Sequence, residues 1–304
     1  MSWYKGYKQE WKEIIETVSR EVNRTPQMIE KDTIQSMFLM GLSKTELPFV
    51  FKGGTSLSKG YGLIDRFSED IDLSMNVKAT ESDKRKSKNE IERIADELGL
   101  VLENPEDVQS RHSYNKYEYE YDSLFSDIPL ELIVETSFYQ TVYPVEKHVI
   151  CSFVGNFCQK NNITLPIPFD ADFVTMNLQS LERTFVDKVF AICDYRIQDM
   201  QDRDSRHLYD IAKILPHLDI NRELDELIDD VRDDRMLSKN NPSAQLKYDI
   251  PEMLHEIITS RFYESDYNNI TKRLLYEDVP YNEAIQRGIA VIADMDIFEY
   301  KKGT

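Results

Sequence analysis

One stretch of the chain, residues 50 to 76, constrains the fold more than any other. It reads VFKGGTSLSKGYGLIDRFSEDIDLSMN, so an apolar run leads into Gly53 and Gly54, and Asp70 and Asp72 follow with one residue between them. The run LPFVF just before the glycines predicts a buried strand that ends in a tight turn. TSLSKGYGLI predicts a short helix, and DIDLSM predicts a second strand because apolar and acidic residues alternate in it.

The glycine turn and the two carboxylates together indicate a site for phosphates and a metal ion. Glycines let the backbone approach a ligand closely, and the N–H groups at the start of the following helix favour an anion. Asp70 and Asp72 share one face of their strand, while Ile71 and Leu73 face the core. Such a turn beside two carboxylates suits magnesium held partly by protein and partly by substrate phosphates. Because the chain has 55 acidic residues, the acid pair is informative only in this context.

The order of elements predicts an α+β chain. Before the glycine pair, WKEIIETVSREV predicts a helix, and Thr25-Pro26 predicts the start of another in QMIEKDTIQSMFLMGL. After the acid pair, KATESDKRKSKNEIERIADELGL predicts a polar helix that begins at Thr80 or Ser82 and ends at Gly99. SYNKYEYEYDSLF and PLELIVETSFY then predict two strands that pair in the same sheet.

Two domains are expected, because 304 residues exceed the usual size of one. ITLPIPF carries two prolines and marks a boundary around residues 163 to 175, and the segments beyond it read as helices. The predicted domains are residues 1–170, with the sheet and the N-terminal helices, and residues 171–304, which are helical.

The tyrosines of SYNKYEYEYDSLF raise a choice between core and binding surface. Tyr117, Tyr119 and Tyr121 fall on one face of the expected strand, and Glu118 and Glu120 fall on the other. A row of tyrosines can stack nucleic-acid bases, but a half-buried strand is the better interpretation of this alternation.

Composition excludes several classes of function. The net charge of −18 argues against a surface that binds nucleic acid throughout, so an RNA partner needs a local basic patch. The candidates near the acid pair are Lys59, Arg66, Lys78, Lys84, Arg85, Lys86 and Lys88, and the last four also fit the solvated face of a helix. No stretch is apolar enough to cross a bilayer, no signal peptide is evident, and the three cysteines lack zinc-site spacing. We expect a cytoplasmic protein without a membrane partner.

The segment FKGGTSLSKGYGLIDRFSEDIDLS resembles the first motif of the nucleotidyltransferase superfamily that includes DNA polymerase β. The motif of that superfamily is Gly-Ser followed after about ten residues by Asp-x-Asp. The segment is more similar to the AbiEii toxin branch, to which the MenT toxins are related, and IEKD, residues 29–32, resembles that family's N-terminal helix. The resemblance implies a polymerase β-like mixed sheet with flanking helices, followed by an all-helical C-terminal domain. It also implies that Asp70 and Asp72 bind the metal, Mg²⁺ or Mn²⁺, and that nucleotide is bound by Lys52, Gly53, Gly54, Thr55, Ser56, Arg66 and Ser68.

Two later segments extend the resemblance to about residue 215. FVDKVFAICDYR is similar to the family's lysine-bearing helix, which implies a catalytic role for Lys188 and nucleotide binding by Arg196. The two residues share an edge of the predicted helix. RHLYDIAKI is similar to the family's RDLYDL segment and implies a role for Asp210, with His207 where aspartate is common. The structural alternatives are a snorkelling pair for the two cations and an ion pair between Arg206 and Asp210.

A third carboxylate is expected on the strand beside the acid pair. PLELIVETSFY offers Glu131 and Glu135, which share a face, so strand parity cannot separate them. The family resemblance favours Glu135, because VETSFY is similar to the family's equivalent segment.

The resemblance implies an enzyme that transfers NMP from an NTP to an acceptor and releases pyrophosphate. In family terms the chain is the toxin of a bacterial toxin–antitoxin or phage-defence (abortive infection) system, with tRNA or another RNA as acceptor and a cognate antitoxin as partner. Catalytic roles fall to Asp70, Asp72, Glu135, Lys188 and Asp210. Two alternatives remain: a kinase that uses the same site to move the γ-phosphoryl group, and a non-catalytic module that senses nucleotide.

Overall fold

A seven-stranded sheet organises the first part of the chain in the computed structural model, which describes residues 2–165 and 173–301. The strands lie in the order β3-β4-β5-β2-β1-β7-β6. Strand β1 is antiparallel to β2 and parallel to β7, and β2 is parallel to β5. The predicted mixed sheet is therefore confirmed. The strand bounds are β1 Phe49–Lys52, β2 Asp70–Met75, β3 Val101–Leu102, β4 Tyr114–Tyr121, β5 Leu130–Ser137, β6 Val145–Ile150 and β7 Val174–Gln179.

Helices α2 and α4 begin where the sequence signals predict, whereas α3 ends at Lys59, before GYGLI, and α5 was not predicted. Thr25 caps α2 by accepting a hydrogen bond from the Met28 N–H, and Thr80 forms a capping box with Asp83 at the start of α4. This cap selects Thr80 over Ser82, and α4 ends at Gly99 in the left-handed conformation. These helices are α1 Lys8–Val22, α2 Pro26–Ser43, α3 Gly53–Lys59, α4 Glu81–Leu98 and α5 Phe153–Asn161.

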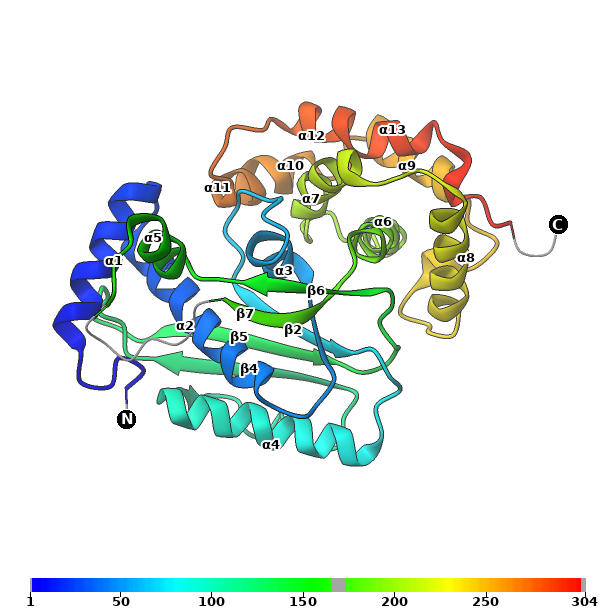
Figure 1. Cartoon of the computed structure of the whole chain (residues 1–304). Coiled ribbons are helices and arrows are strands. Elements are labelled where there is room, and N and C mark those ends of the chain that lie inside the picture. Colours follow the sequence, from blue (N-terminus) through cyan, green and yellow to red (C-terminus); the bar gives the residue numbers. More distant parts are fainter. Residues whose placement is uncertain (1, 166–172, 302–304) are drawn as a thin grey trace. The chain divides into compact units, whose positions relative to one another are not determined.

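One face of the sheet forms the core of this region. Tyr117, Tyr119 and Tyr121 are each at most 2% exposed, and the ring of Phe38 on α2 lies 6.4 Å from that of Tyr119. The tyrosine row is therefore a packing surface, as the alternation indicated. Helix α4 runs along the sheet beside β4, and α1, α2 and α5 pack together (Figure 1).

Three strands, β3, β6 and β7, were not predicted. VTMNLQ forms β7 with Val174, Met176 and Leu178 buried, a period-two pattern hidden next to the proline-rich segment. The prolines of ITLPIPF, Pro166 and Pro168, lie outside the described residues. VEKHVI forms β6 at the edge of the sheet, where it pairs with one neighbouring strand, β7. Its polar residues, which are typical of an edge strand, weaken the alternation that would have predicted a strand.

The chain divides into two compact units. The first comprises Met1–Tyr61 and Glu69–Gln179, and the second comprises Gly62–Ser68 and Ser180–Thr304. We expected the division after residue 170, and it falls later because β7 pairs with β1 and β6. The excursion Gly62–Ser68 joins the second unit through backbone hydrogen bonds of 2.9 Å, from the Phe67 N–H to the Leu274 carbonyl and from the Tyr276 N–H to the Asp65 carbonyl.

The second unit is helical, as predicted. Its α-helices are α6 Leu181–Ile197, α7 Arg206–Ile214, α8 Arg222–Met236, α9 Ile250–Thr259, α10 Glu264–Asp266, α11 Lys272–Leu274, α12 Tyr281–Arg287 and α13 Ile289–Ala293. A π-helical turn, Tyr267–Thr271, links α10 to α11, and three 3₁₀ turns lie at Leu215–His217, Pro242–Ala244 and Asp296–Phe298. Of the helices in the described part of the chain, none is both long enough and apolar enough to span a bilayer.

Candidate active site

The glycine turn between β1 and α3 lies directly against Asp72. Gly53 has a φ of +76°, and a Cβ added there would come within 2.0 Å of the Asp72 Oδ2 atom. A side chain at this position would strain the backbone and would force the Asp72 carboxylate to move. The glycine therefore allows the turn and the acid strand to approach each other.

The hydroxyls after the glycine pair hold the turn in place. Thr55 and Ser56 are at most 1% exposed. The Thr55 hydroxyl donates to the Asp70 carbonyl at 2.5 Å, and the Ser56 hydroxyl donates to the Gly53 carbonyl at 2.9 Å. The Thr55 bond ties the start of α3 to the start of β2, and the Ser56 bond closes the first turn of α3.

The register of the sheet places four charged residues in one row. Lys52 on β1 lies opposite Asp72 on β2, Asp72 lies opposite Glu135 on β5, and Glu135 lies opposite Lys116 on β4. Directly paired residues project to the same face of a sheet, so two carboxylates stand between two lysines. Asp70 lies two residues from Asp72 and shares this face, while Ile71 and Leu73 are fully buried on the other.

The electrostatics of this row centre on Glu135. Burial raises the pKa of the Glu135 carboxyl, and the charges of Asp72 and Asp70 raise it further. A hydrogen bond from Tyr114 and the charge of Lys116 act in the opposite direction. Carboxylates that repel one another in this way are stabilised by a bound cation.

Glu131, the other residue considered as the third carboxylate, is exposed and lies opposite Glu120 on β4. Asp72 is thus paired with Glu135 and not with Glu131. The sheet register separates two residues that strand parity alone leaves equivalent.

The IEKD segment on α2 carries three consecutive charged residues, Glu30, Lys31 and Asp32, and each has different partners in the first unit. Glu30 is fully buried and accepts hydrogen bonds of 2.6 Å from the Ser123 hydroxyl and the Leu124 N–H. Burial lowers the pKa of Lys31, which interacts electrostatically with Glu69, Asp70 and Glu131. Lys31 therefore adds a cation beside the acid strand, although the sequence did not single it out.

Asp32 forms a buried ion pair with Lys59 and also accepts a hydrogen bond of 2.8 Å from the Phe153 N–H. The Lys59 side chain is 4% exposed and donates to the Ser36 hydroxyl at 2.8 Å. The expectation that Lys59 belongs to a basic rim for RNA is therefore wrong, because its ammonium is buried against a carboxylate.

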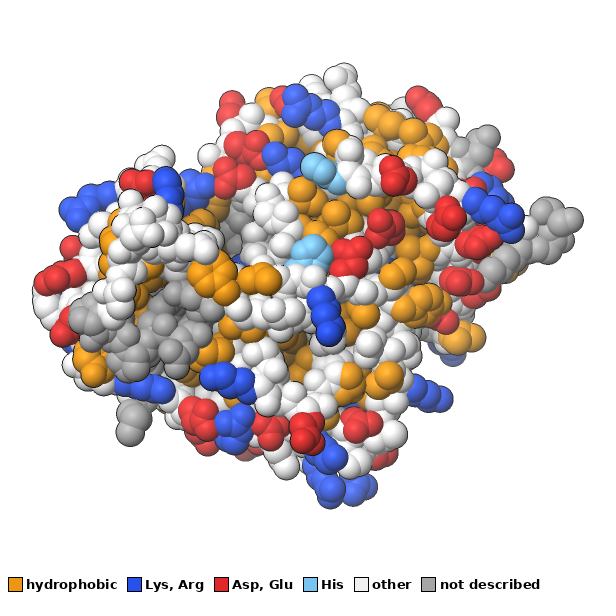
Figure 2. Space-filling view, viewed as in Figure 1, with side chains coloured by type: hydrophobic (Ala, Val, Ile, Leu, Met, Phe, Trp, Pro, Cys, Tyr) orange, Lys and Arg blue, Asp and Glu red, His pale blue; other side chains and the backbone are white. Residues whose placement is uncertain are grey.

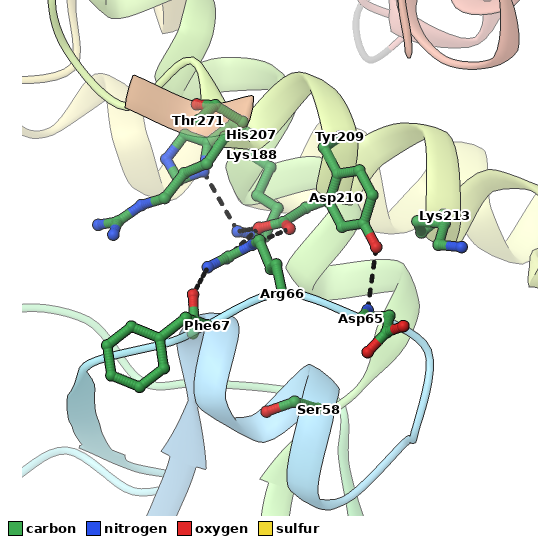
Figure 3. Close-up of polar contacts among 12 residues, drawn as sticks. Ser58, Asp65, Arg66, Phe67, Lys188, His207, Tyr209, Asp210, Lys213 and Thr271 are labelled. Atoms are coloured by element: carbon green, nitrogen blue, oxygen red, sulfur yellow. Dashed lines mark hydrogen bonds and ion pairs between the residues drawn. The ribbon is translucent and has the colours of Figure 1, made fainter. Parts of the chain in front are cut away.

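In the second unit, Asp210 is the centre of a buried ion-pair cluster (Figure 3). Its Oδ1 and Oδ2 atoms accept hydrogen bonds of 2.7 and 2.8 Å from Nε and Nη2 of Arg66, and Oδ2 lies 2.7 Å from the Lys188 Nζ. Burial alone favours the neutral acid, but Arg66 and Lys188 hold the Asp210 pKa well below its usual range. Asp210 is thus an anion under all ordinary conditions.

The structural alternative considered for Asp210 was an ion pair with Arg206. Arg206 pairs with Asp204 at 2.9 Å, and the carboxylate of Asp210 is held by Arg66 and Lys188. Arg66, also considered for the RNA rim, has a side chain only 2% exposed, which excludes it from such a surface. Ser68 ends the same short segment of the second unit.

Arg196 is not brought into this cluster. It forms an ion pair of 3.6 Å with Glu256 on α9, and its guanidinium lies 5.0 Å from the centre of the Phe262 ring. Lys188 and Arg196 both lie on α6, but their partners differ. The prediction that Arg196 binds nucleotide remains a prediction.

Helix α4 carries the basic cluster near the acid pair in the sequence. Acidic and basic side chains are mixed along this helix, at the lower edge of the space-filling view (Figure 2). Lys84 pairs with Glu81 at 2.8 Å and Lys88 with Glu92 at 3.4 Å. Arg85 and Lys86 are exposed.

Among residues 2–165 and 173–301, no three acidic, histidine or cysteine side chains converge closely enough to hold a metal ion by themselves. Asp70 and Asp72 nevertheless supply the oxygen ligands that Mg²⁺ prefers, beside a turn that only glycine can form. The residues present therefore fit a cation that takes its remaining ligands from substrate and water.

Comparison with known proteins identifies a family and solved structures of similar fold. The family described as "Nucleotidyl transferase AbiEii toxin, Type IV TA system" matches residues 37–288. The crystal structure of JHP933 from Helicobacter pylori is similar at a TM-score of 0.51 and 19% identity, covering 90% of this chain and 93% of that one. MenT4, a nucleotidyltransferase toxin from Mycobacterium tuberculosis, has a TM-score of 0.48 and 16% identity, with 94% and 88% covered.

No curated protein matches the chain. The family match spans most of the sequence, including the glycine turn, the acid strand and the cluster around Asp210. The chain belongs to the AbiEii family of nucleotidyltransferase toxins.

Proposed function

We propose that the protein transfers NMP from an NTP to a hydroxyl group of an acceptor and releases pyrophosphate. The observation that carries this proposal is the carboxylate set of Asp70, Asp72 and Glu135, aligned by the sheet register beside the Gly53 turn. Membership of a nucleotidyltransferase family supports the same reaction class.

In this reaction the acceptor oxygen attacks the α-phosphorus of the NTP. A bond forms between that oxygen and the α-phosphorus, the bond from the α-phosphorus to the oxygen bridging to the β-phosphorus breaks, and pyrophosphate leaves. The hydroxyl proton passes to a carboxylate of the set or to water. Glu135 is suited to receive it, because its raised pKa brings its proton affinity closer to neutrality.

Asp70 and Asp72 are the residues that would hold divalent ions, Mg²⁺ or Mn²⁺. Such ions lower the pKa of an acceptor hydroxyl and neutralise charge on a triphosphate. We assign Lys52 and the turn Gly53–Ser56 to the β and γ phosphates, supported by the contact between Gly53 and Asp72.

Lys188 supplies positive charge for the leaving pyrophosphate, and Asp210 and Arg66 hold it in place. The ammonium is fixed by Asp210 at 2.7 Å, and Asp210 is in turn fixed by both nitrogens of the Arg66 fork. A preorganised cation favours a transition state in which negative charge develops on the leaving group.

The family places this activity in a toxin, so we propose a cognate antitoxin as partner and a role in bacterial phage defence. We propose tRNA as the acceptor class. Exposed Arg85 and Lys86 on α4 offer positive charge for RNA in a chain that is otherwise acidic.

The experiment compares wild-type protein with Asp72→Asn. Incubation with NTP, Mg²⁺ and total tRNA should modify tRNA with the wild-type protein, and the variant or added chelator should remove nearly all turnover. The thermal midpoint of the variant should not fall, because removing one member of a repelling carboxylate set costs little stability. A folded Asp72→Asn protein with wild-type turnover would contradict the assignment.

A further inference from the structure

His207 lies in contact with Lys188 but has no role in the reaction as described above. It lies on α7 one turn before Asp210, so both side chains face Lys188 on α6 (Figure 3). The Nδ1 atom of His207 lies 3.2 Å from the Lys188 Nζ. The His207 ring also stacks on Tyr195 of α6, with ring centres 6.3 Å apart and planes 15° apart. The imidazole is therefore held in a defined orientation.

The contact requires a neutral imidazole whose Nδ1 accepts. Burial lowers the pKa of Lys188, and the Asp210 carboxylate acts in the opposite direction. As an ammonium, Lys188 has three N–H donors and no acceptor, so the hydrogen bond is assigned from Lys188 to Nδ1, with the ring proton on Nε2. Burial and the charge of Lys188 lower the pKa of His207 to about 3, against the pull of Asp204 and Asp210. The imidazole is thus uncharged near neutral pH.

The charged groups around His207 leave a positive balance. Arg66 and Lys188 bring two positive charges, and Asp210 brings one negative charge. The other nearby anion, Asp204, is paired with Arg206 at 2.9 Å and with the exposed Arg203 at 3.6 Å. A neutral residue at position 207 therefore leaves one positive charge in this buried cluster.

The Lys188 ammonium has a donor to spare. Its side chain is 7% exposed, and its contacts within the described part of the chain are Asp210 at 2.7 Å and His207 at 3.2 Å. Two acceptors fix the direction of the third N–H group. Buried charges are normally compensated, so the remaining N–H group of Lys188 is suited to donate to an anionic oxygen, whose charge would offset the excess positive charge of the cluster.

We propose that His207 is a positioning residue that orients the Lys188 ammonium toward a phosphate oxygen of the triphosphate without neutralising its charge. This inference rests on the proposed function. An aspartate at the same place would accept the same hydrogen bond but cancel the remaining positive charge. An asparagine would accept it and stay neutral.

The test compares His207→Asn, His207→Asp and His207→Phe by calorimetric binding of inorganic tripolyphosphate and of NTP with Mg²⁺. His207→Asn should bind both within about twofold of wild type, and His207→Asp should bind both on the order of tenfold more weakly. His207→Phe, which keeps a ring but no acceptor, should fall between them. In turnover assays, His207→Asp should raise the KM for NTP more than it lowers kcat.

His255→Asp and His255→Asn are matched controls, because His255 lies in the same unit with a side chain 54% exposed. They repeat the change in charge away from Lys188 and should leave both affinities unchanged. Thermal midpoints identify any variant that fails to fold, and His207→Asn still tests the proposal if His207→Asp is unstable.

The inference is overturned if His207→Asp binds tripolyphosphate like wild type, if His207→Asn loses as much affinity as His207→Asp, or if wild-type protein binds neither probe. The proposed function fails separately: wild-type protein would then bind tripolyphosphate, with the expected order of variants, and transfer no NMP. Conversely, normal NMP transfer with an unchanged KM in His207→Asp overturns the role of His207 alone.

Discussion

At the scale of single residues, burial decides which charged side chains can meet a ligand. Lys59 and Arg66 are close to the acid pair in the sequence, yet their side chains are only 4% and 2% exposed and each is paired with a carboxylate. Breaking either pair would leave an uncompensated buried charge, so neither cation is available to an RNA phosphate. Lys188 differs because it has both a fixed orientation and a remaining donor.

Lys188 gives the first prediction at this scale. Lys188→Met removes the ammonium while keeping most of the side-chain volume, and Asp210 remains paired with Arg66. We expect NTP binding, measured by calorimetry, to weaken by on the order of tenfold or more, because a charge-assisted contact to phosphate is lost. Lys84→Met on α4 is the control. Equal effects at both positions would show that Lys188 makes no specific contact with the triphosphate.

His207 gives a second prediction, on the dependence of stability on pH. The folded state keeps the imidazole neutral, because its pKa is lowered to about 3, whereas the unfolded chain takes up a proton below the ordinary value of 6.5. The unfolded state thus binds more protons in this window, and the free energy of unfolding falls as pH drops through it. Between about pH 7 and pH 5.5, wild type should lose about 1 kcal/mol more than His207→Asn. Identical urea-unfolding profiles across this range would mean that His207 titrates normally.

At the scale of elements, the turn between β1 and α3 sets how closely the glycine segment approaches the acid strand. Gly53 and Gly62 both have positive φ angles, +76° and +64°. A Cβ at Gly53 would meet Asp72, whereas one at Gly62 would meet nothing within 4 Å. Substituting each glycine by alanine therefore distinguishes the effect of backbone strain alone from the effect of a clash with Asp72.

Gly53→Ala and Gly62→Ala use this difference. Gly62→Ala should cost about 1 kcal/mol of unfolding free energy, from the left-handed backbone alone, and leave turnover intact. Gly53→Ala should cost more and abolish transfer, because Asp72 must move. Chemical denaturation and turnover measure both variants. Full activity in Gly53→Ala would contradict the proposal that transfer depends on the close approach of the glycine turn to Asp72.

The elements also show what the sequence could and could not predict. Strand β2 and helix α4 were predictable because alternation, a capping threonine and Gly99 are local signals. The edge strand β6 has a weak local signal, and β7 follows a proline-rich segment that suggested a boundary. Their positions depend on pairing with residues far away in the chain.

The same distinction applies to the candidate site. Asp70 and Asp72 stand out in the sequence because the glycine turn precedes them. Lys116 comes to lie opposite Glu135 only through the pairing of β4 with β5. Alternation along the strand predicts that Lys116 shares a face with Glu118. It does not predict that Lys116 lies opposite Glu135, because that register depends on how the strands pair in the folded sheet.

At the scale of the whole molecule, a net charge of −18 opposes an RNA acceptor, so binding must depend on local positive charge. Reversing the exposed pair Arg85 and Lys86 to glutamate should raise the KM for tRNA and leave that for NTP unchanged. Reversing Arg222 and Lys160, with side chains 88% and 73% exposed, makes the same change in net charge elsewhere. We expect the wild-type reaction to slow steeply with salt. Indifference to salt and to both reversals would point to an acceptor other than RNA.

The central claim is that this chain moves the nucleotidyl group, and the fate of a labelled phosphate tests it most directly. Parallel reactions with tRNA and Mg²⁺ use NTP labelled at the α-phosphate or at the γ-phosphate. The account predicts that the α label becomes attached to the acceptor while the γ label appears only in pyrophosphate, and that Asp72→Asn shows neither. Transfer of the γ label to the acceptor would establish a kinase, and nucleotide binding without transfer of either label would establish a non-catalytic module. Either result would contradict the account.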